Sequence, residues 1–175
     1  IDETSGETAS ETDETGSAAQ TVDASSEDDW VYLDLESEST VTPSTPEDSA
    51  DWDLGFKRYV VSLNGGVSGS GEVEAAVITD EAYEDITQAP LDGYFTDLPD
   101  GDDSDEDDDL ALITADSAWY AYDFTAHTLS PNPLVYVIHT VEGNYFKLEF
   151  LGYYNDAGSS GYPSIRFAEI AAPGD

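Results

Sequence analysis

The sequence predicts a mostly β fold, with a single antiparallel domain behind an acidic leader. Three observations support this class. Apolar and polar residues alternate with a period of two in regular bursts from Trp30 onward. Turn residues such as Gly, Pro, Asn and Asp separate the bursts, and the 3.6-residue periodicity of an amphipathic helix is scarce. A length of 175 residues suits one such domain with some chain to spare.

The N-terminal segment differs from the rest of the chain in composition. Up to about Asp29 it consists mainly of Ser, Thr, Glu, Asp, Gly and Ala. Such a segment buries too little apolar surface to offset an ordering entropy of roughly 1–2 kcal/mol per residue. We therefore expect disorder here, and we divide the chain into a disordered acidic leader at residues 1–20 and a β domain at residues 21–175.

Strand patterns fill the first half of the domain. Residues 30–36 place three apolar side chains on one face, which is typical of a half-buried strand, and a Pro-rich loop follows them. Residues 51–63 continue the alternation and predict a further strand, which ends at the Asn-Gly-Gly turn of residues 64–66. Residues 71–78 then predict a return strand.

Strand patterns also dominate the second half. Residues 117–124 alternate, and residues 134–139 and 145–154 flank the turn sequence "TVEGN", which indicates a hairpin. Residues 162–170 predict a closing strand.

Two segments depart from this pattern. Residues 79–89 fit a short helix, because Ala82, Ile86 and Ala89 fall on one side of it. Residues 127–133, "HTLSPNP", contain two prolines that break regular elements, so they predict a loop.

The net charge of the chain excludes some classes of binding partner. It carries 40 acidic and 4 basic side chains, for a formal net charge of −36. Such a chain does not replace the counterions of a nucleic acid, and it does not dock on anionic lipid. Because the screening length falls to about 3 Å at 1 M salt, this composition predicts adaptation to a saline medium. A secreted protein that uses its charge for solubility is the alternative.

Several stretches carry a resemblance to a known family. They are "TVDASSEDDWVYLDLE", "DWDLGFKRYVVSLNGG", "LDGYFTD" and "VYVIHTVEGNYFKLEFLGYYNDAGSSGYPSIRF", in this order along the chain. Their most specific positions are two short patterns, made by Trp52, Asp53, Phe56 and Arg58 before Asn-Gly-Gly, and by Tyr154, Asp156 and Ala157. With these stretches the chain resembles the HmuY-like haem-binding lipoproteins of bacterial outer membranes.

The resemblance implies a fold, a function and a location. The family's fold is all-β and hand-shaped, and it grips haem between finger-like loops. Its members take haem from haemoproteins and pass it to an outer-membrane receptor. They are tethered through a lipidated N-terminal cysteine, which this chain lacks. We therefore expect haem or haemoproteins and a receptor as partners, an extracellular or outer-membrane location, and membrane contact only through a lost N-terminal lipid anchor.

Candidate haem ligands follow from the resemblance and from the composition. Haem iron needs His, Met, Cys or Tyr as an axial donor, and the chain has no Met and no Cys. The family's ligands lie in its finger region, here between about residues 100 and 123. The candidates are Tyr120 and Tyr122, which lie closest to the second ligand position, with His127 and His139.

Each of these candidates has a purely structural alternative. His127 fits a loop surface, and His139 fits the end of a strand beside a hairpin. Aromatic residues on strands are usually core or cross-strand partners. Arg58 is expected to belong to the framework, with its guanidinium held by carboxylates and backbone carbonyls, and a haem propionate is its alternative partner.

An acidic run at residues 100–109, "DGDDSDEDDD", suggests a cation site in a solvated loop. Hard cations prefer oxygen ligands, and Asp100, Asp102, Asp103 and Asp105 are the candidate Ca²⁺ ligands. The alternative is loose screening by Na⁺ or Mg²⁺.

The motifs of common enzymes are missing from the sequence. It has no Cys nucleophile, no Gly-x-Ser-x-Gly elbow and no His-Glu-x-x-His zinc motif, so we expect no enzyme. The preferred function is an extracellular haem-binding protein that captures haem and delivers it to a receptor, adapted to high salt. The alternative is a surface or matrix module on the same scaffold without haem, which binds Ca²⁺ through its acidic loop or joins an extracellular assembly.

Overall fold

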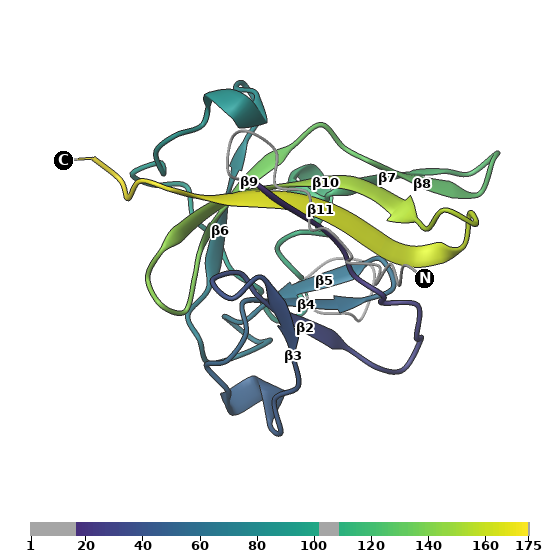
Figure 1. The fold of residues 1–175 in the computed structure, drawn as a ribbon, viewed down its shortest axis with the longest axis horizontal. Helices are drawn as coiled ribbons and strands as arrows, with labels where there is room; N and C mark the ends of the chain where they lie inside the picture. The colour runs from purple at the N-terminus through teal and green to yellow at the C-terminus, as the bar shows by residue number, and fades with distance from the viewer. Residues whose placement is uncertain (1–16, 102–108, 175) are drawn as a thin grey trace, which may run out of the picture.

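Antiparallel strands form two sheets and a separate hairpin in the computed structural model, which describes residues 17–101 and 109–174 (Figure 1). This confirms the predicted fold class. The strands are β1 (Ala18–Thr21), β2 (Val31–Asp34), β3 (Ser39–Val41), β4 (Leu54–Lys57), β5 (Val60–Leu63), β6 (Glu74–Ile78), β7 (Tyr120–Asp123), β8 (Thr128–Pro131), β9 (Val135–His139), β10 (Tyr145–Tyr154) and β11 (Ser160–Ile170).

Helical structure is limited to three single turns of 3₁₀ helix in the described ranges: η1 (Pro46–Asp48), η2 (Tyr83–Asp85) and η3 (Ala115–Ser117). Within those ranges no helix has the length and apolar character needed to cross a bilayer.

The order of the strands explains the shape. The larger sheet has five strands in the order β1-β11-β10-β9-β6, and the smaller one has four in the order β3-β2-β4-β5. The β7–β8 hairpin forms a two-stranded sheet of its own and extends beside the end of β10 (Figure 1). The two larger sheets therefore build the body, and the hairpin projects from it.

The main hydrophobic core lies between the two larger sheets. Leu33, Leu54 and Phe56 of the smaller sheet are completely buried in one cluster with Tyr136, Leu148 and Phe167 of the larger sheet. Each such side chain contributes about 1.5–3 kcal/mol when it leaves water. A smaller cluster on the outer face of the larger sheet packs η2 against β9.

Most of the predicted strands are present. The hairpin around "TVEGN" is confirmed, because Tyr145 pairs with His139 across it. The strand predicted at residues 145–154 coincides with β10, and the closing strand is β11. The alternation of apolar side chains predicted these elements because each buries one face against the core.

The continuous strand predicted at residues 51–63 is wrong. The chain reverses at Arg58 and Tyr59, so that β4 and β5 pair with each other and Lys57 lies opposite Val60. Arg58 has a φ of 56°, and positive φ at the first position of a two-residue turn is usually supplied by Gly. The turn has no glycine, and the sequence pattern therefore does not reveal it.

Other boundaries also differ from the prediction. The first strand begins at Ala18, inside the segment expected to be disordered, because β1 pairs with β11. The return strand at residues 71–78 is β6, but it pairs with β9 of the other sheet and not with β5. The helix predicted at residues 79–89 is only the 3₁₀ turn η2, and the predicted loop at residues 127–133 contains β8.

Candidate functional site

The β7–β8 hairpin positions the first group of candidate residues. The carboxylate of Asp123 accepts the backbone N–H groups of Thr125 and Ala126, at 2.7 and 3.0 Å, and so closes the turn. His127 ends this turn with a φ of 55°, a conformation in which His is one of the more frequent non-glycine residues. Its Nδ1 lies 2.9 Å from the hydroxyl of Tyr122. A hydrogen bond therefore orients the imidazole on an exposed hairpin.

A pocket of about 450 Å³ lies between this hairpin, the β4–β5 turn and the ends of β10 and β11. Three of the four predicted haem-binding residues line it. Its lining consists of Arg58, Tyr59, Tyr120, Tyr122, His127, Leu129, Tyr153, Tyr154 and Ser160. This volume is within the usual range of small-molecule sites, roughly 300–1,000 Å³.

Hydrogen bonds tie the two sides of the pocket together. The hydroxyl of Tyr154 accepts the backbone N–H of Leu129 at 2.9 Å, which joins the hairpin to β10. The guanidinium of Arg58 donates to the carbonyls of Ser25 and Ser160 and, at 2.8 Å, to the hydroxyl of Ser160. The expected framework role of Arg58 is therefore present, with a hydroxyl in place of the expected carboxylates. At the same time Arg58 places a positive charge at the wall of the pocket.

Burial keeps two of the phenols in the pocket neutral. It raises the pKa of Tyr120, to which the neighbouring Tyr59 adds, and it also raises the pKa of Tyr153. Anionic phenolate is the form of Tyr that binds ferric iron. Tyr120 is consequently better suited to packing and hydrogen bonding than to iron ligation. Its ring packs edge-on against Tyr59, with ring centres 5.4 Å apart.

The structure places the fourth candidate, His139, elsewhere. His139 ends β9, stacks on Tyr145 with ring centres 4.5 Å apart, and approaches Glu74 through Nδ1 at 3.3 Å. Tyr145 and Tyr154 are the two ends of β10, which are roughly 30 Å apart along an extended strand. His139 therefore lies at the end of the sheet opposite the pocket, in the strand-end environment that was its alternative.

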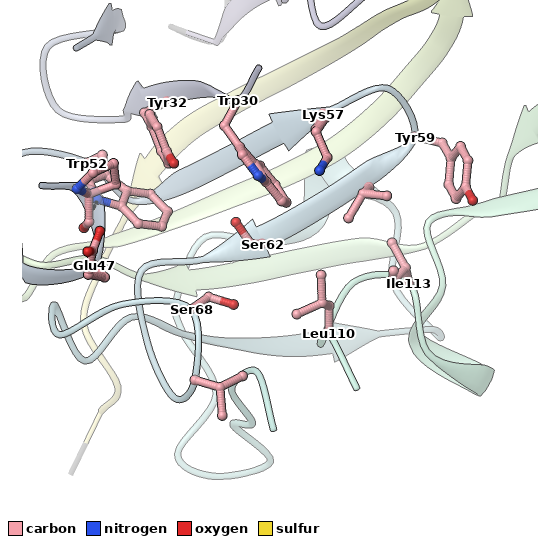
Figure 2. A pocket seen from close by; sticks show the side chains of 13 residues that line it. Trp30, Tyr32, Glu47, Trp52, Lys57, Tyr59, Ser62, Ser68, Leu110 and Ile113 are labelled. Atoms are coloured by element: carbon pink, nitrogen blue, oxygen red, sulfur yellow. Dashed lines mark hydrogen bonds between the residues drawn. The ribbon is translucent and has the colours of Figure 1, made fainter. Parts of the chain in front are cut away.

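A second pocket of about 450 Å³ adjoins the first, and Tyr59 lines both. Figure 2 shows Trp30, Tyr32 and Trp52 along one wall, with Leu110 and Ile113 across from Lys57 and Ser62. The amine of Lys57 lies 5.0 Å from the ring centre of Trp30. The residues that line this pocket include no His, and its aromatic wall contains the phenols of Tyr32 and Tyr59.

The predicted calcium loop is mostly outside the described residues. Asp102, Asp103 and Asp105 fall in the gap at residues 102–108, and only Asp100 precedes it. The calcium site in this loop stays a prediction.

Sequence reasoning missed half of the pocket. Tyr153, Tyr154 and Ser160 approach the hairpin only because β10 and β11 end beside it. Ser160 and Arg58 are 102 residues apart in the chain. An available signal was the Tyr-Tyr pair at the end of β10, of which Tyr153 is buried and Tyr154 is exposed and belongs to the family pattern noted in the sequence.

Comparison with known proteins identifies the family. The HmuY protein family matches residues 26–167. The fold is similar to that of the apo HmuY analogue of Tannerella forsythia (17% identity, TM-score 0.66, 88% of this chain and 95% of that one). It is also similar to apo PinO of Porphyromonas gingivitis (15% identity, TM-score 0.64, 88% of this chain and 97% of that one).

A third similar structure is a protein of Bacteroides vulgatus described as HmuY-like and haem-binding (18% identity, TM-score 0.60, 89% of this chain and 93% of that one). No curated protein matches the sequence. At these identities the structures show a common fold, and the family match spans most of the chain. The chain therefore belongs to the HmuY family.

Proposed function

We propose that the pocket beside the β7–β8 hairpin binds haem and that His127 is an axial ligand of its iron. One observation carries this proposal. Nδ1 of His127 is engaged by the hydroxyl of Tyr122, and among the described residues no partner occupies Nε2. In metal sites a ligating His commonly donates one ring N–H to a neighbour and offers the other nitrogen to the metal.

The residues around His127 suit a planar, dianionic ligand. Haem supplies an electrophilic iron, two propionates and a large apolar face. Arg58 is a fixed cation at the wall for a propionate, and it has N–H groups beyond the three hydrogen bonds that hold it. Tyr59, Tyr120 and Tyr153 offer ring surface for the macrocycle. Donor, counter-charge and apolar wall therefore meet in one pocket.

The wider role is capture of haem outside the cell and transfer to a receptor. Family membership supports this role, as does the position of His127 on an exposed hairpin at an accessible pocket. A net charge of −36 repels the haem propionates at low ionic strength, and molar salt screens that repulsion. We therefore place the function at the cell surface or in a saline exterior.

A ferric-haem titration in 1 M NaCl tests the assignment. We expect a Soret shift with saturation in the wild-type chain. In His127→Ala the affinity falls at least about tenfold, which corresponds to about 1.4 kcal/mol. The matched control is His139→Ala, which removes the chain's other imidazole at the far end of β10 and keeps the wild-type affinity.

Two outcomes contradict the proposal. If the wild-type chain gives no Soret shift at any salt concentration, the pocket does not bind haem, and the scaffold without haem is the better account. If His139→Ala loses affinity and His127→Ala does not, haem binds at the other end of the larger sheet.

A further inference from the structure

Four carboxylates meet where the two large sheets approach each other, and none of them lines the pocket beside the β7–β8 hairpin. They belong to Asp34 at the end of β2, Glu36 just after it, Asp53 just before β4, and Glu142 in the β9–β10 turn. One oxygen from each lies within 4.8 Å of the others. Three segments, two from the smaller sheet and one from the larger, thus bring four acids to one point.

Asp53 is a buried residue, and Glu36 is half-buried with one oxygen that is fully buried. Oε2 of Glu36 is completely buried and has no hydrogen-bond partner in the described part of the chain. Its Oε1, in contrast, accepts bonds from Thr140 and Asn144. Asp53 is only 1% exposed, and its oxygens accept the backbone N–H groups of Leu35 and Val141. Both side chains are therefore held in place, while one buried oxygen has nothing to bind.

No basic side chain neutralises this cluster. The chain has only four Lys and Arg residues, and each makes contacts elsewhere. Lys57 lies over Trp30, Arg58 bonds to Ser160, Lys147 donates to the carbonyl of Tyr83, and Arg166 pairs with Glu84 and Glu149. Four ionised carboxylates this close repel one another strongly in a partly buried site. Protons or a metal ion must supply the missing positive charge.

We propose that Asp34, Glu36, Asp53 and Glu142 bind a hard divalent cation of the Ca²⁺ class. The donor set consists of oxygens, which Ca²⁺ prefers, and it contains neither the imidazole nor the thiolate that favours Zn²⁺. Carboxylates arriving from separate segments suit the flexible geometry of Ca²⁺ better than the strict octahedron of Mg²⁺. The site is distinct from the acidic run at residues 100–109.

The electrostatics of the cluster agree with this assignment. Burial is the main cause that raises the pKa of Asp53 to about 7, and the charges of Glu36 and Glu142 raise it further. The N–H groups of Leu35 and Val141, which donate to Asp53, lower its pKa but do not offset the effect of burial. Burial also raises the pKa of Glu142, and Glu36 adds to that shift. A bound cation removes the repulsion and links the β9–β10 turn to β2 and β4. Its role is to fasten the two sheets together.

Calorimetric titration with CaCl₂ and thermal melting, both in 1 M NaCl, test the site, because this salt suppresses loose counterion binding. We expect saturable Ca²⁺ binding in the range of extracellular modules, with Kd about 10⁻⁴–10⁻³ M. A rise in Tm accompanies it. In Glu142→Gln, an exposed turn position, the affinity falls at least about tenfold. The matched control is Glu81→Gln, which removes one exposed charge outside the cluster and keeps the wild-type Ca²⁺ affinity.

Three results overturn the proposal. The first is the absence of saturable binding up to 10-fold above that range. The second is an equal Ca²⁺ response in Glu142→Gln and Glu81→Gln. The third is an identical Tm rise with MgCl₂, which would indicate screening of the whole chain. Each of these results leaves protons as the neutralising charge, and none depends on haem binding.

Discussion

Two individual residues at the pocket adopt a strained backbone conformation. Arg58 and His127 are two of four non-glycine residues with positive φ in the described ranges. Such conformations cost of order 1–3 kcal/mol and persist where surrounding contacts hold them. Arg58 is held by Ser25 and Ser160, and His127 by Tyr122. Both strained residues line the same pocket, which fits a site that needs them there.

Replacing Arg58 with glycine removes the charged side chain but keeps the backbone conformation of the turn. Glycine adopts a φ of 56° readily, so Arg58→Gly keeps the β4–β5 turn and removes the guanidinium. Loss of one charge-assisted hydrogen bond to a propionate costs about 1.5–3 kcal/mol, so haem affinity falls about tenfold or more. The control is Glu38→Gly, at a φ of 54° on the exposed surface, which leaves affinity unchanged. Equal affinities in wild type and Arg58→Gly would remove Arg58 from the site.

The carboxylate of Asp123 makes the stability of the hairpin turn depend on pH. The N–H groups of Ala126 and Thr125 hold the pKa of Asp123 below its usual 3.8. A lowered pKa in the folded state means that the contribution to stability is present above pH 3.8 and is lost as the pH falls through the folded value. We expect the amide resonances of Thr125 and Ala126 to titrate together below pH 3.8. A midpoint at or above that value would show that the carboxylate does not close the turn in solution.

At the scale of the elements, the ends of several strands come together to form the pocket. Gly161, near the start of β11, has a φ of 93°, and a Cβ there would lie 2.8 Å from the backbone of Ser25 and 2.7 Å from the guanidinium of Arg58. The close approach of β11 to the segment around Ser25 therefore requires a glycine. Ala24 in this segment donates its N–H to the carbonyl of Gly161 and accepts the backbone N–H of Arg58, so it links β11 to the β4–β5 turn beside the pocket.

A pair of glycine variants measures this close approach. Gly158→Ala, at a φ of 79° with open space around it, costs only the strain of the conformation, about 1–2 kcal/mol. Gly161→Ala adds a steric clash worth about 1–3 kcal/mol and also displaces Arg58. Urea unfolding of both variants gives the difference. If Gly161→Ala is no less stable than Gly158→Ala, β11 does not pack closely against the segment around Ser25.

The elements that the sequence predicted well are those with long alternating patterns. β10 and β11 could be predicted because apolar residues recur at every second position along most of their ten and eleven residues. The β4–β5 turn was hidden because arginine occupies a position usually taken by glycine. β8 was missed because Pro131 reads as a breaker, although proline is tolerated at the end of a two-stranded hairpin. Local patterns do not report such exceptions.

The same distinction applies to the candidate site. Tyr120, Tyr122 and His127 were found together because they belong to one hairpin. Their partners Arg58 and Ser160 come from distant segments, and only the packing of the sheets brings them close. His139 was included because imidazole is scarce in the chain, and scarcity says nothing about position.

The charge distribution belongs to the whole molecule. All four Lys and Arg residues serve specific contacts, and Lys147 is only 7% exposed. The surface therefore has a large excess of carboxylates with few cations to offset them. Self-repulsion of this kind destabilises the compact state at low ionic strength.

Salt should consequently stabilise the fold. Between 10 mM and 1 M NaCl the screening length falls from about 30 Å to about 3 Å, and we expect Tm to rise steadily. Each kcal/mol gained corresponds to about 2–4 °C for a chain of this size. Melting curves by circular dichroism at fixed pH give the slope. A Tm that is flat or decreasing over this range would contradict adaptation to a saline medium.

In the function that we propose, haem binds between the β7–β8 hairpin and the β4–β5 turn. The crystal structure of the chain with ferric haem, grown at molar salt, tests it most directly. We expect the iron to be bonded to Nε2 of His127, Nδ1 to remain paired with Tyr122, and a propionate to lie on Arg58. Haem bound at the aromatic wall of Trp30 and Trp52, or beside His139, would contradict it.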